Sequence, residues 1–459
     1  MILRPARGMV RRCALFVAVA AVPSTAFAGT PASAEARSEG FDISGSFRVR
    51  GEALDGQFRP GKAQDDSLLL LRTALRASYT TGPVQIVGEL MDARTYGQHP
   101  DSPIGTGEVN TLEPLQAYVA LDLGPVLGAG SRMQAKAGRF TMDLGSSRLV
   151  TRADYANFPN AFTGAKVDLT TASGGEVELF WTMPDTRLPN DQRALQGNTT
   201  KFDRSTTDLQ FYGAHLTHPL FAGVQGELYA YQLNEQDAER FPSRDRHILT
   251  YGTRFSRAPA PGALDFDIEY ARQSGTARAS SASADTVDCD TEASFLHAEA
   301  GHTFAGGWRT RLSAHYDFAS GDRPGADYNR FDSLFGGRRD FGPTGVYGPA
   351  GWSNIISGGI RAEARPTPRL DVMGMYRALW LDEATDAFSF SGVRDASGAS
   401  GTWAGHQAEL RIRYWLKPNR LRLEAGAAYL AKGRFLRNAP NAPASGDTRF
   451  AYLSLSASL

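Results

Sequence analysis

Charged side chains in this chain of 459 residues alternate with apolar ones along many short segments. Residues 46–53, for example, place Arg48 and Arg50 on the face opposite Phe47 and Val49. A period of two residues is that of a β-strand, and the guanidinium group of arginine binds carboxylates through paired hydrogen bonds. These residue types therefore point to recognition of an anion along the polar face of a sheet.

The candidate anion-binding residues are basic side chains on the polar faces of the expected strands, together with Asp168. They are Arg48, Arg50, Arg72, Arg76, Lys136, Lys166, Arg309, Arg311, Arg361, Arg377, Arg411, Arg413 and Arg422. If the sheet closes so that the first strand pairs with the last, several of these side chains would meet at that seam. Such a row of arginines would attract a polyanion. Carboxylates face the same way in comparable number, so a structural salt-bridge lattice is an equally open interpretation.

Motifs for other chemistry are missing from the sequence. The eight histidines are scattered, no G-x-S-x-G elbow or phosphate loop occurs, and Cys289 is the one cysteine outside the first residues of the chain. We therefore expect no enzyme activity, no metal and no cofactor. The formal net charge of +0 gives no reason to expect a nucleic-acid partner.

About eighteen alternating segments, rich in Val, Phe, Tyr and Thr, follow one another along the chain. They fall near 41–53, 68–80, 84–93, 114–123, 132–140, 161–170, 175–183, 207–217, 223–233, 247–257, 263–272, 292–304, 308–318, 352–364, 369–381, 403–416, 420–431 and 449–459. The connections between them alternate strictly between long and short, and the short ones carry Gly and Pro.

That alternation is typical of a transmembrane barrel, which has tight turns on the periplasmic side and long loops outside. The sequence therefore predicts an all-β fold, an antiparallel transmembrane β-barrel of about eighteen strands in the outer membrane. The longest loop, 319–351, is expected outside the barrel or folded into the pore. Aromatic residues near strand ends are expected to form an interfacial girdle. They are Phe41, Tyr79, Trp308, Tyr316, Trp352, Trp380, Trp403, Trp415 and Tyr429.

The N-terminal residues match a secretory signal peptide. Arginines precede an apolar run over 14–22, and an A-x-A site ends at Ala28, with Ala34 as a second possible cleavage point. This divides the chain into a signal peptide (1–28), a periplasmic segment (29–40) and the barrel (41–459). No later run reaches the roughly 18 apolar residues that a membrane helix needs.

Four short stretches resemble the alginate export family of outer-membrane porins. They are "GRFTMDLGSSRLV" (138–150), "FPNAFTGAKVDL" (158–169), "YDFASGD" (316–322) and "FDSLFGG" (331–337), followed by Asn354. The chain departs from the family at Phe140, where Gln is frequent, at Thr163, where Asp is frequent, and at Leu459, where outer-membrane barrels commonly end in Phe.

The resemblance implies an eighteen-stranded barrel that passes an anionic polysaccharide passively through an arginine-lined, loop-gated lumen. If the constriction residues of the family are carried over to this sequence, the constriction would be lined by Arg72, Arg76, Lys166, Asp168, Arg411 and Arg413. The 319–351 loop would restrict the mouth, with Asp322, Arg323, Arg338 and Arg339 as its charged residues.

We expect a porin for an anionic solute, with a uronate polysaccharide as the first candidate. An uptake porin for small organic acids is the alternative within transport, and a barrel enzyme or adhesin the alternative outside it. The expected partners are outer-membrane lipid and lipopolysaccharide, the transported anion, the barrel-assembly machinery and periplasmic export components.

Overall fold

The structure, a computed structural model, describes residues 39–459, and eighteen β-strands account for most of them. The first nine are β1 (Gly40–Asp55), β2 (Asp65–Thr81), β3 (Val84–Tyr96), β4 (Asn110–Gly124), β5 (Arg132–Phe140), β6 (Phe162–Thr170), β7 (Glu176–Pro184), β8 (Leu209–Pro219) and β9 (Val224–Glu235). The second nine are β10 (His247–Arg257), β11 (Leu264–Ala277), β12 (Cys289–Thr303), β13 (Arg311–Ala319), β14 (Ile355–Thr367), β15 (Leu370–Trp380), β16 (Trp403–Lys417), β17 (Leu421–Lys432) and β18 (Thr448–Ser458).

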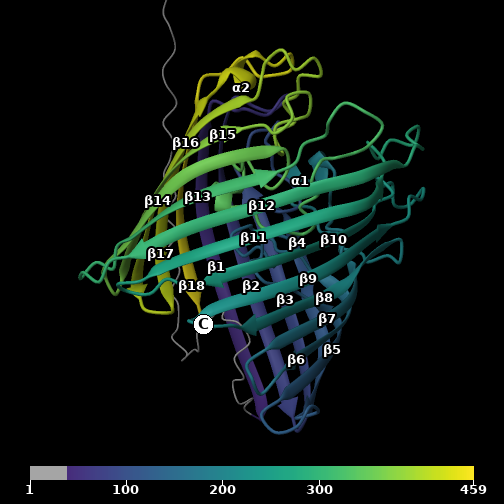
Figure 1. Cartoon of the computed structure of the whole chain (residues 1–459), viewed down its shortest axis with the longest axis vertical. Coiled ribbons are helices and arrows are strands. Elements are labelled where there is room, and N and C mark those ends of the chain that lie inside the picture. The colour runs from purple at the N-terminus through teal and green to yellow at the C-terminus, as the bar shows by residue number, and fades with distance from the viewer. Residues whose placement is uncertain (1–38) are drawn as a thin grey trace, which may run out of the picture.

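Each strand pairs with the next in antiparallel register, and β18 pairs with β1, which closes the sheet into one barrel (Figure 1). Closure leaves no free sheet edge, so backbone N–H and C=O groups are paired around the whole wall. The predicted fold class, an antiparallel barrel of eighteen strands, is confirmed. The expected signal peptide (1–28) and all but the last two residues of the 29–40 segment lie outside the described residues.

Connections alternate in length around the barrel, as the sequence predicts. Long loops at one end include 141–161, 320–354 and 381–402, and short turns at the other end include 82–83 and 418–420. Two short helices, α1 (Gln192–Gln196) and α2 (Arg434–Asn438), and the 3₁₀ turn η1 (Arg339–Phe341) belong to the long loops. Within residues 39–459, no helix is long and apolar enough to cross a membrane.

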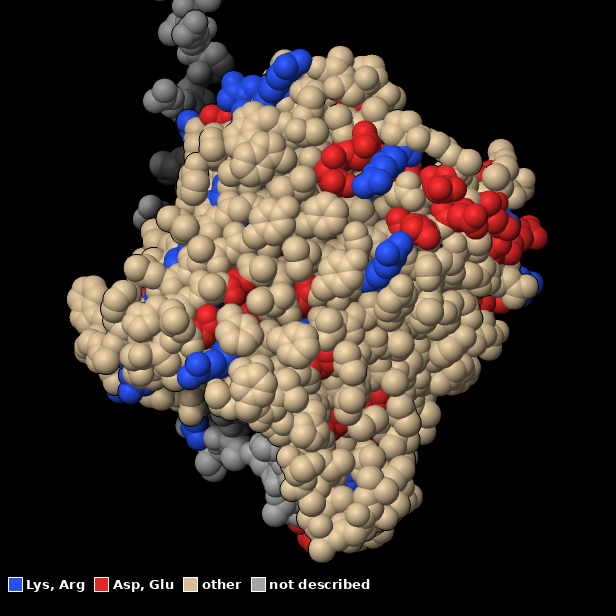
Figure 2. All heavy atoms as spheres, in the orientation of Figure 1, with Lys and Arg blue, Asp and Glu red and all other residues tan. Residues whose placement is uncertain are grey.

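The two faces of the wall follow the sequence alternation. On β1, Phe41 and Phe47 are 77% and 45% exposed, whereas Arg50 on the same strand is 1% exposed. Figure 2 shows an outer wall with few charged side chains, and acidic residues gathered toward the end with the long loops. An apolar outer face and a charged inner face are what a barrel in lipid requires.

Two long loops fold into the interior of the barrel and contact each other there. Residues 141–161 and 320–354 meet through a parallel bridge between Val150 and Phe335. Buried side chains of both loops pack with inward-facing aromatic residues of the wall, for example Phe335 against Phe162 at 5.3 Å between ring centroids. The strand that ends at Ala319 therefore leads into a loop that folds into the lumen.

Two of the expected girdle residues are not in the girdle. Trp352 lies in the 320–354 loop, fully buried, with its ring 4.6 Å from those of Phe295 and Phe341. Trp415 shares the inward face of β16 with Arg413, whose guanidinium lies 5.7 Å from its ring. Strand ends alone do not fix which face an aromatic side chain takes, and here both belong to the interior.

Candidate functional site

Arg148 of the 141–161 loop lies in the lumen and makes ion pairs with both the wall and the other lumen loop. Its guanidinium contacts Asp267 at 3.1 Å and Glu269 at 2.9 Å on β11, and Asp340 of the 320–354 loop at 2.9 Å. Burial raises the pKa of the Asp340 carboxyl, but Arg148 together with His297 and Arg361 outweighs burial and holds this pKa well below its ordinary value. Arg148 thus ties two lumen loops to the barrel wall.

Tyr155 forms a second connection between the wall and the loops. Its ring lies 4.6 Å from the guanidinium of Arg50 on β1 and 5.0 Å from that of Arg339 in the 320–354 loop. Arg50 also donates a hydrogen bond to the Tyr155 carbonyl at 2.9 Å. Burial raises the pKa of the Tyr155 hydroxyl to about 12, so the ring stays neutral between two cations.

Many of the expected inward-facing basic residues are neutralised by wall carboxylates. Arg50 pairs with Glu52 at 2.8 Å, Arg413 with Asp371 at 2.9 Å, and Arg377 with Asp317 at 3.2 Å. The same holds for Lys166 with Asp168, Arg311 with Glu299 and Arg422 with Glu424. For these residues the wall is a salt-bridge lattice, and Asp168 is part of it.

Other expected residues have no carboxylate partner among the described residues. Arg48 and Arg72 are neighbours in the register of β1 and β2, and both donate to the Asp154 carbonyl, at 3.1 and 2.9 Å. Carbonyl oxygens accept these hydrogen bonds without cancelling either positive charge. Within residues 39–459, Arg76, Lys136, Arg361 and Arg411 likewise make no ion pair, although Lys136 lies 4.8 Å from the Phe140 ring.

The strand register brings several of these arginines together across the closure of the barrel. Arg422 on β17 stands opposite Ser456 on β18, which stands opposite Arg48 on β1. Arg48 in turn stands opposite Arg72 on β2. Because side chains in one row of an antiparallel sheet share a face, three arginines line the lumen in one row, with Ser456 between Arg422 and Arg48.

Arg309 is placed differently from the sequence expectation. It was expected on the strand 308–318, but β13 begins at Arg311, and Arg309 lies in the turn 304–310 with a positive φ of 45°. The turn is longer than the Gly306-Gly307 pair alone indicates. Arg309 is exposed at the end of the barrel where the short turns lie.

The expected gating residues of the 320–354 loop have separate roles. Arg339 pairs with Glu409 of β16 at 2.6 Å, and the guanidinium of Arg338 lies 4.8 Å from the Phe390 ring. Asp322 accepts a hydrogen bond from the Asn329 backbone at 3.1 Å, whereas Arg323 is exposed. The loop is therefore fastened at Arg339, and Arg338 is left without a carboxylate partner in the described part of the chain.

The two lumen loops border a cavity of about 620 Å³ that opens toward the long loops. Arg148, Arg187, Arg338 and Arg339 line it, with Glu108, Asp154 and Asp340 as the acidic residues. Burial lowers the pKa of Arg338, and Glu108 acts in the opposite direction. A cavity of this size is in the range of small-molecule sites.

Arg187, which lines this cavity, and Arg59, which binds the 320–354 loop, were not expected from the sequence. Arg59 donates to the carbonyls of Val346 and Gly348, at 2.8 and 3.1 Å, and burial lowers its pKa to about 9. Both arginines lie in loops, where no alternation marks a face. The sequence therefore carries no signal that could have found them.

A closed eighteen-stranded barrel with an apolar outside and an arginine-rich lumen defines a porin-type channel of the outer membrane. The profile of a family described as alginate export matches residues 40–451 of this chain. The chain belongs to the alginate export family. Family and fold indicate a channel rather than an enzyme, and an outer-membrane location.

Solved structures with the same fold come from Pseudomonas aeruginosa. OccK9 (OpdG) matches with a TM-score of 0.58 and 15% identity, covering 91% of this chain and 98% of its own. OpdK matches with a TM-score of 0.56 and 14% identity, covering 91% and 99%. OpdK with vanillate gives a TM-score of 0.54 at 13% identity, covering 91% and 98%. The search of curated proteins returned no match.

Proposed function

We propose that this protein passes an anionic solute passively through the barrel, and that the solute is a uronate polysaccharide. The observation that carries the proposal is the set of lumen-facing arginines that no carboxylate of the described residues neutralises. They include Arg48 and Arg72 on the wall, Arg338 in the cavity between the lumen loops and Arg411 near the short-turn end. Membership of the alginate export family supports a uronate as the solute.

Two charge patterns are interleaved in this lumen, and they have different consequences. The paired residues, such as Arg413 with Asp371, hold strands together and add no net field. The unpaired arginines leave positive potential inside a low-dielectric wall, which raises the local concentration of anions. Because a polyuronate carries one carboxylate on each sugar, it can exchange one arginine for the next along the path.

Single-channel recording in planar bilayers tests the proposal. We expect a reversal potential across a salt gradient that reports anion selectivity, and current block by an oligouronate. Arg338→Gln should lower both, whereas Arg323→Gln removes the same charge from an exposed position of the same loop and should change neither. Cation selectivity in the wild type, or equal effects of the two substitutions, would refute the proposal.

A small carboxylate is the second candidate solute, and one observation favours it. The lumen loops meet at Val150 and Phe335 and leave a cavity of about 620 Å³, which suits a small molecule better than a polymer. OpdK, a barrel of the same fold, has been solved with vanillate, a small carboxylate. Liposome uptake of vanillate without block by an oligouronate would favour this candidate over the polysaccharide.

A further inference from the structure

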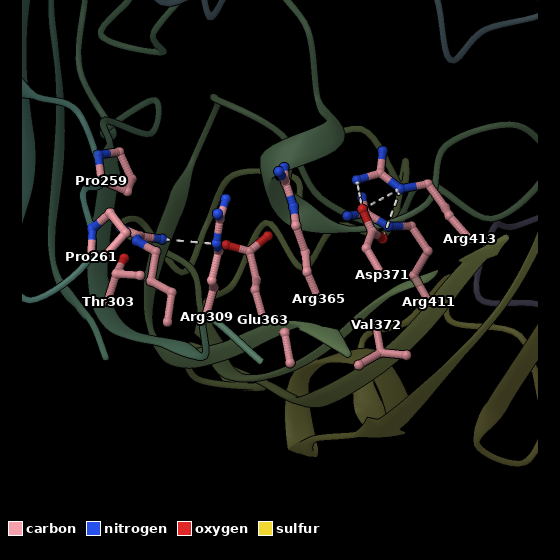
Figure 3. A pocket seen from close by; sticks show the side chains of 12 residues that line it. Pro259, Pro261, Thr303, Arg309, Glu363, Arg365, Asp371, Val372, Arg411 and Arg413 are labelled. Carbon is pink, nitrogen blue, oxygen red and sulfur yellow. Dashed lines mark hydrogen bonds and ion pairs between the residues drawn. The ribbon is translucent and has the colours of Figure 1, made fainter. Parts of the chain in front are cut away.

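The short-turn end of the barrel carries a basic pocket of about 260 Å³ that is separate from the cavity between the loops. Arginines from four elements line it: Arg309 from the turn 304–310, Arg311 from β13, Arg365 from β14, and Arg411 and Arg413 from β16. Figure 3 shows these side chains in a row along the wall, with Glu363 and Asp371 between them. In barrels of this class the short turns face the periplasm.

The two carboxylates of the pocket, Glu363 and Asp371, already contact arginines of the wall. Asp371 accepts from Arg413 at 2.9 Å, and Glu363 lies 3.5 Å from Arg311, which also pairs with Glu299. The contacts of Asp371 with Arg413 and of Glu363 with Arg311 are among the dashed lines of Figure 3. Arg311, which also pairs with Asp265, and Arg413 are therefore neutralised, whereas the remaining arginines of the pocket make no ion pair in the described structure.

Three guanidinium groups remain without an ion pair in the part of the chain that the structure describes: those of Arg309, Arg365 and Arg411. The Nε atom of Arg411 is buried and has no hydrogen-bond acceptor. An unsatisfied, shielded donor beside two further cations is a site that an anion would complete. Figure 3 places Arg365 between Glu363 and Asp371, so an incoming carboxylate would meet it together with Arg411.

The two ends of the barrel also differ in charge, and the short-turn end is the more positive. The short turns contain Arg309, Arg369 and Arg420 and no carboxylate. In the long loops at the other end, Asp and Glu outnumber Lys and Arg. A polyanion approaching the short-turn end is therefore attracted more strongly than one approaching the loop end, where the charges nearly balance.

We propose that this pocket is a capture site at the periplasmic mouth, which binds carboxylates of the uronate chain before the chain enters the lumen. The inference rests on the proposed function and adds a direction, because capture from the short-turn side becomes faster than capture from the loop side. A fixed field of this kind changes association rates and leaves the passive nature of transport unaltered.

The test is the frequency of current block by an oligogalacturonate of defined length, added to one side of a planar bilayer at a time. Channel orientation is read from the side on which streptavidin reaches biotin attached to Cys289, at the loop end of β12. We expect block from the short-turn side to be more frequent by about tenfold or more at low salt. This difference should shrink as salt is raised.

The variant Arg309→Gln/Arg365→Gln/Arg411→Gln should lose this difference between sides. The matched control Arg257→Gln/Arg369→Gln/Arg420→Gln removes three charges from the same end but outside the pocket, and should reduce the difference less than the pocket variant does. Equal block in both variants, or more frequent block from the loop side in the wild type, would overturn the capture site.

Two further outcomes separate this inference from the function on which it rests. If no oligouronate blocks from either side and the wild type lacks anion selectivity, the proposed function fails and the capture site fails with it. If block occurs at equal frequency from both sides, the function stands and only the capture site fails. Should the triple variant not assemble, Arg411→Gln should reduce block from the short-turn side and Arg411→Lys should restore it.

Discussion

Replacing Arg148 by Met should release the 320–354 loop from the barrel wall. Arg148 is the one residue of the 141–161 loop that contacts both β11 and Asp340 through ion pairs in the described structure. Breaking a buried ion pair by removing one partner costs about 3–5 kcal/mol. The free-energy cost expected for Arg148→Met depends on which other partners the three carboxylates keep once Arg148 is removed.

Two of the three carboxylates keep another partner. Asp267 retains Arg254, at 2.7 Å, and Glu269 retains the hydroxyl of Tyr229, at 3.0 Å. Only Asp340 loses its ion pair, and with it the largest of the charges that lower its pKa. Because the Asp340 side chain is 39% exposed, water screens part of this loss, and we expect a smaller cost of about 1–2 kcal/mol, which shifts the equilibrium between docked and released loop by roughly tenfold.

Single-channel recording measures this directly, because a released loop widens the lumen intermittently. Arg148→Met should show larger open-channel current and more current noise than the wild type. Arg272→Met is the control, since it removes an exposed ion pair between β11 and Glu292 of β12, and such pairs contribute about 0–1 kcal/mol. Identical conductance and noise in the two variants would refute the role of Arg148.

Three further predictions concern the same lumen contacts. Gly336→Ala should loosen the two loops, because a Cβ atom there would lie 1.7 Å from the Arg148 carbonyl, whereas Gly325→Ala, in open space in the same loop, should leave the current noise unchanged. Tyr155→Ala removes a ring held between two guanidinium groups, each contact being worth about 0.5–2 kcal/mol, and should raise the noise without unfolding the barrel, as heat-modified gel migration would check. Asp340 has a lowered pKa in the folded protein, so its contribution is complete above the ordinary Asp pKa and is lost as the pH falls below about 4. Current noise should therefore rise in acid for the wild type, and Asp340→Asn should show that noise at neutral pH already; a pH response that survives in Asp340→Asn would contradict this assignment.

The strands were predictable because their signal is local. Alternation of side chains along β1 or β16 is written in consecutive residues, and it gives both the strand and the face that each residue takes. The alternating loop lengths gave the closed barrel and its even strand number. The predicted start of a strand was wrong where a turn is longer than its Gly pair indicates, as at Arg309 before β13.

The candidate site was only partly predictable, because the partner of a charge is a long-range property. Arg411 and Arg413 are two residues apart on one face of β16, and nothing in their sequence context says that Asp371 neutralises Arg413 and leaves Arg411 unpaired. Arg148 was visible only as part of a family-like stretch, and its three partners come from a distant strand and a distant loop.

The sequence by itself determined the barrel, the number of strands, the inner and outer faces and the long loop after β13. The tertiary structure alone decided that this loop and 141–161 fold into the lumen, and which arginines remain uncompensated. The physical reason is the range of the interactions involved. Strand periodicity acts between neighbours in the chain, whereas ion pairing and loop packing depend on which residues closure of the sheet brings together.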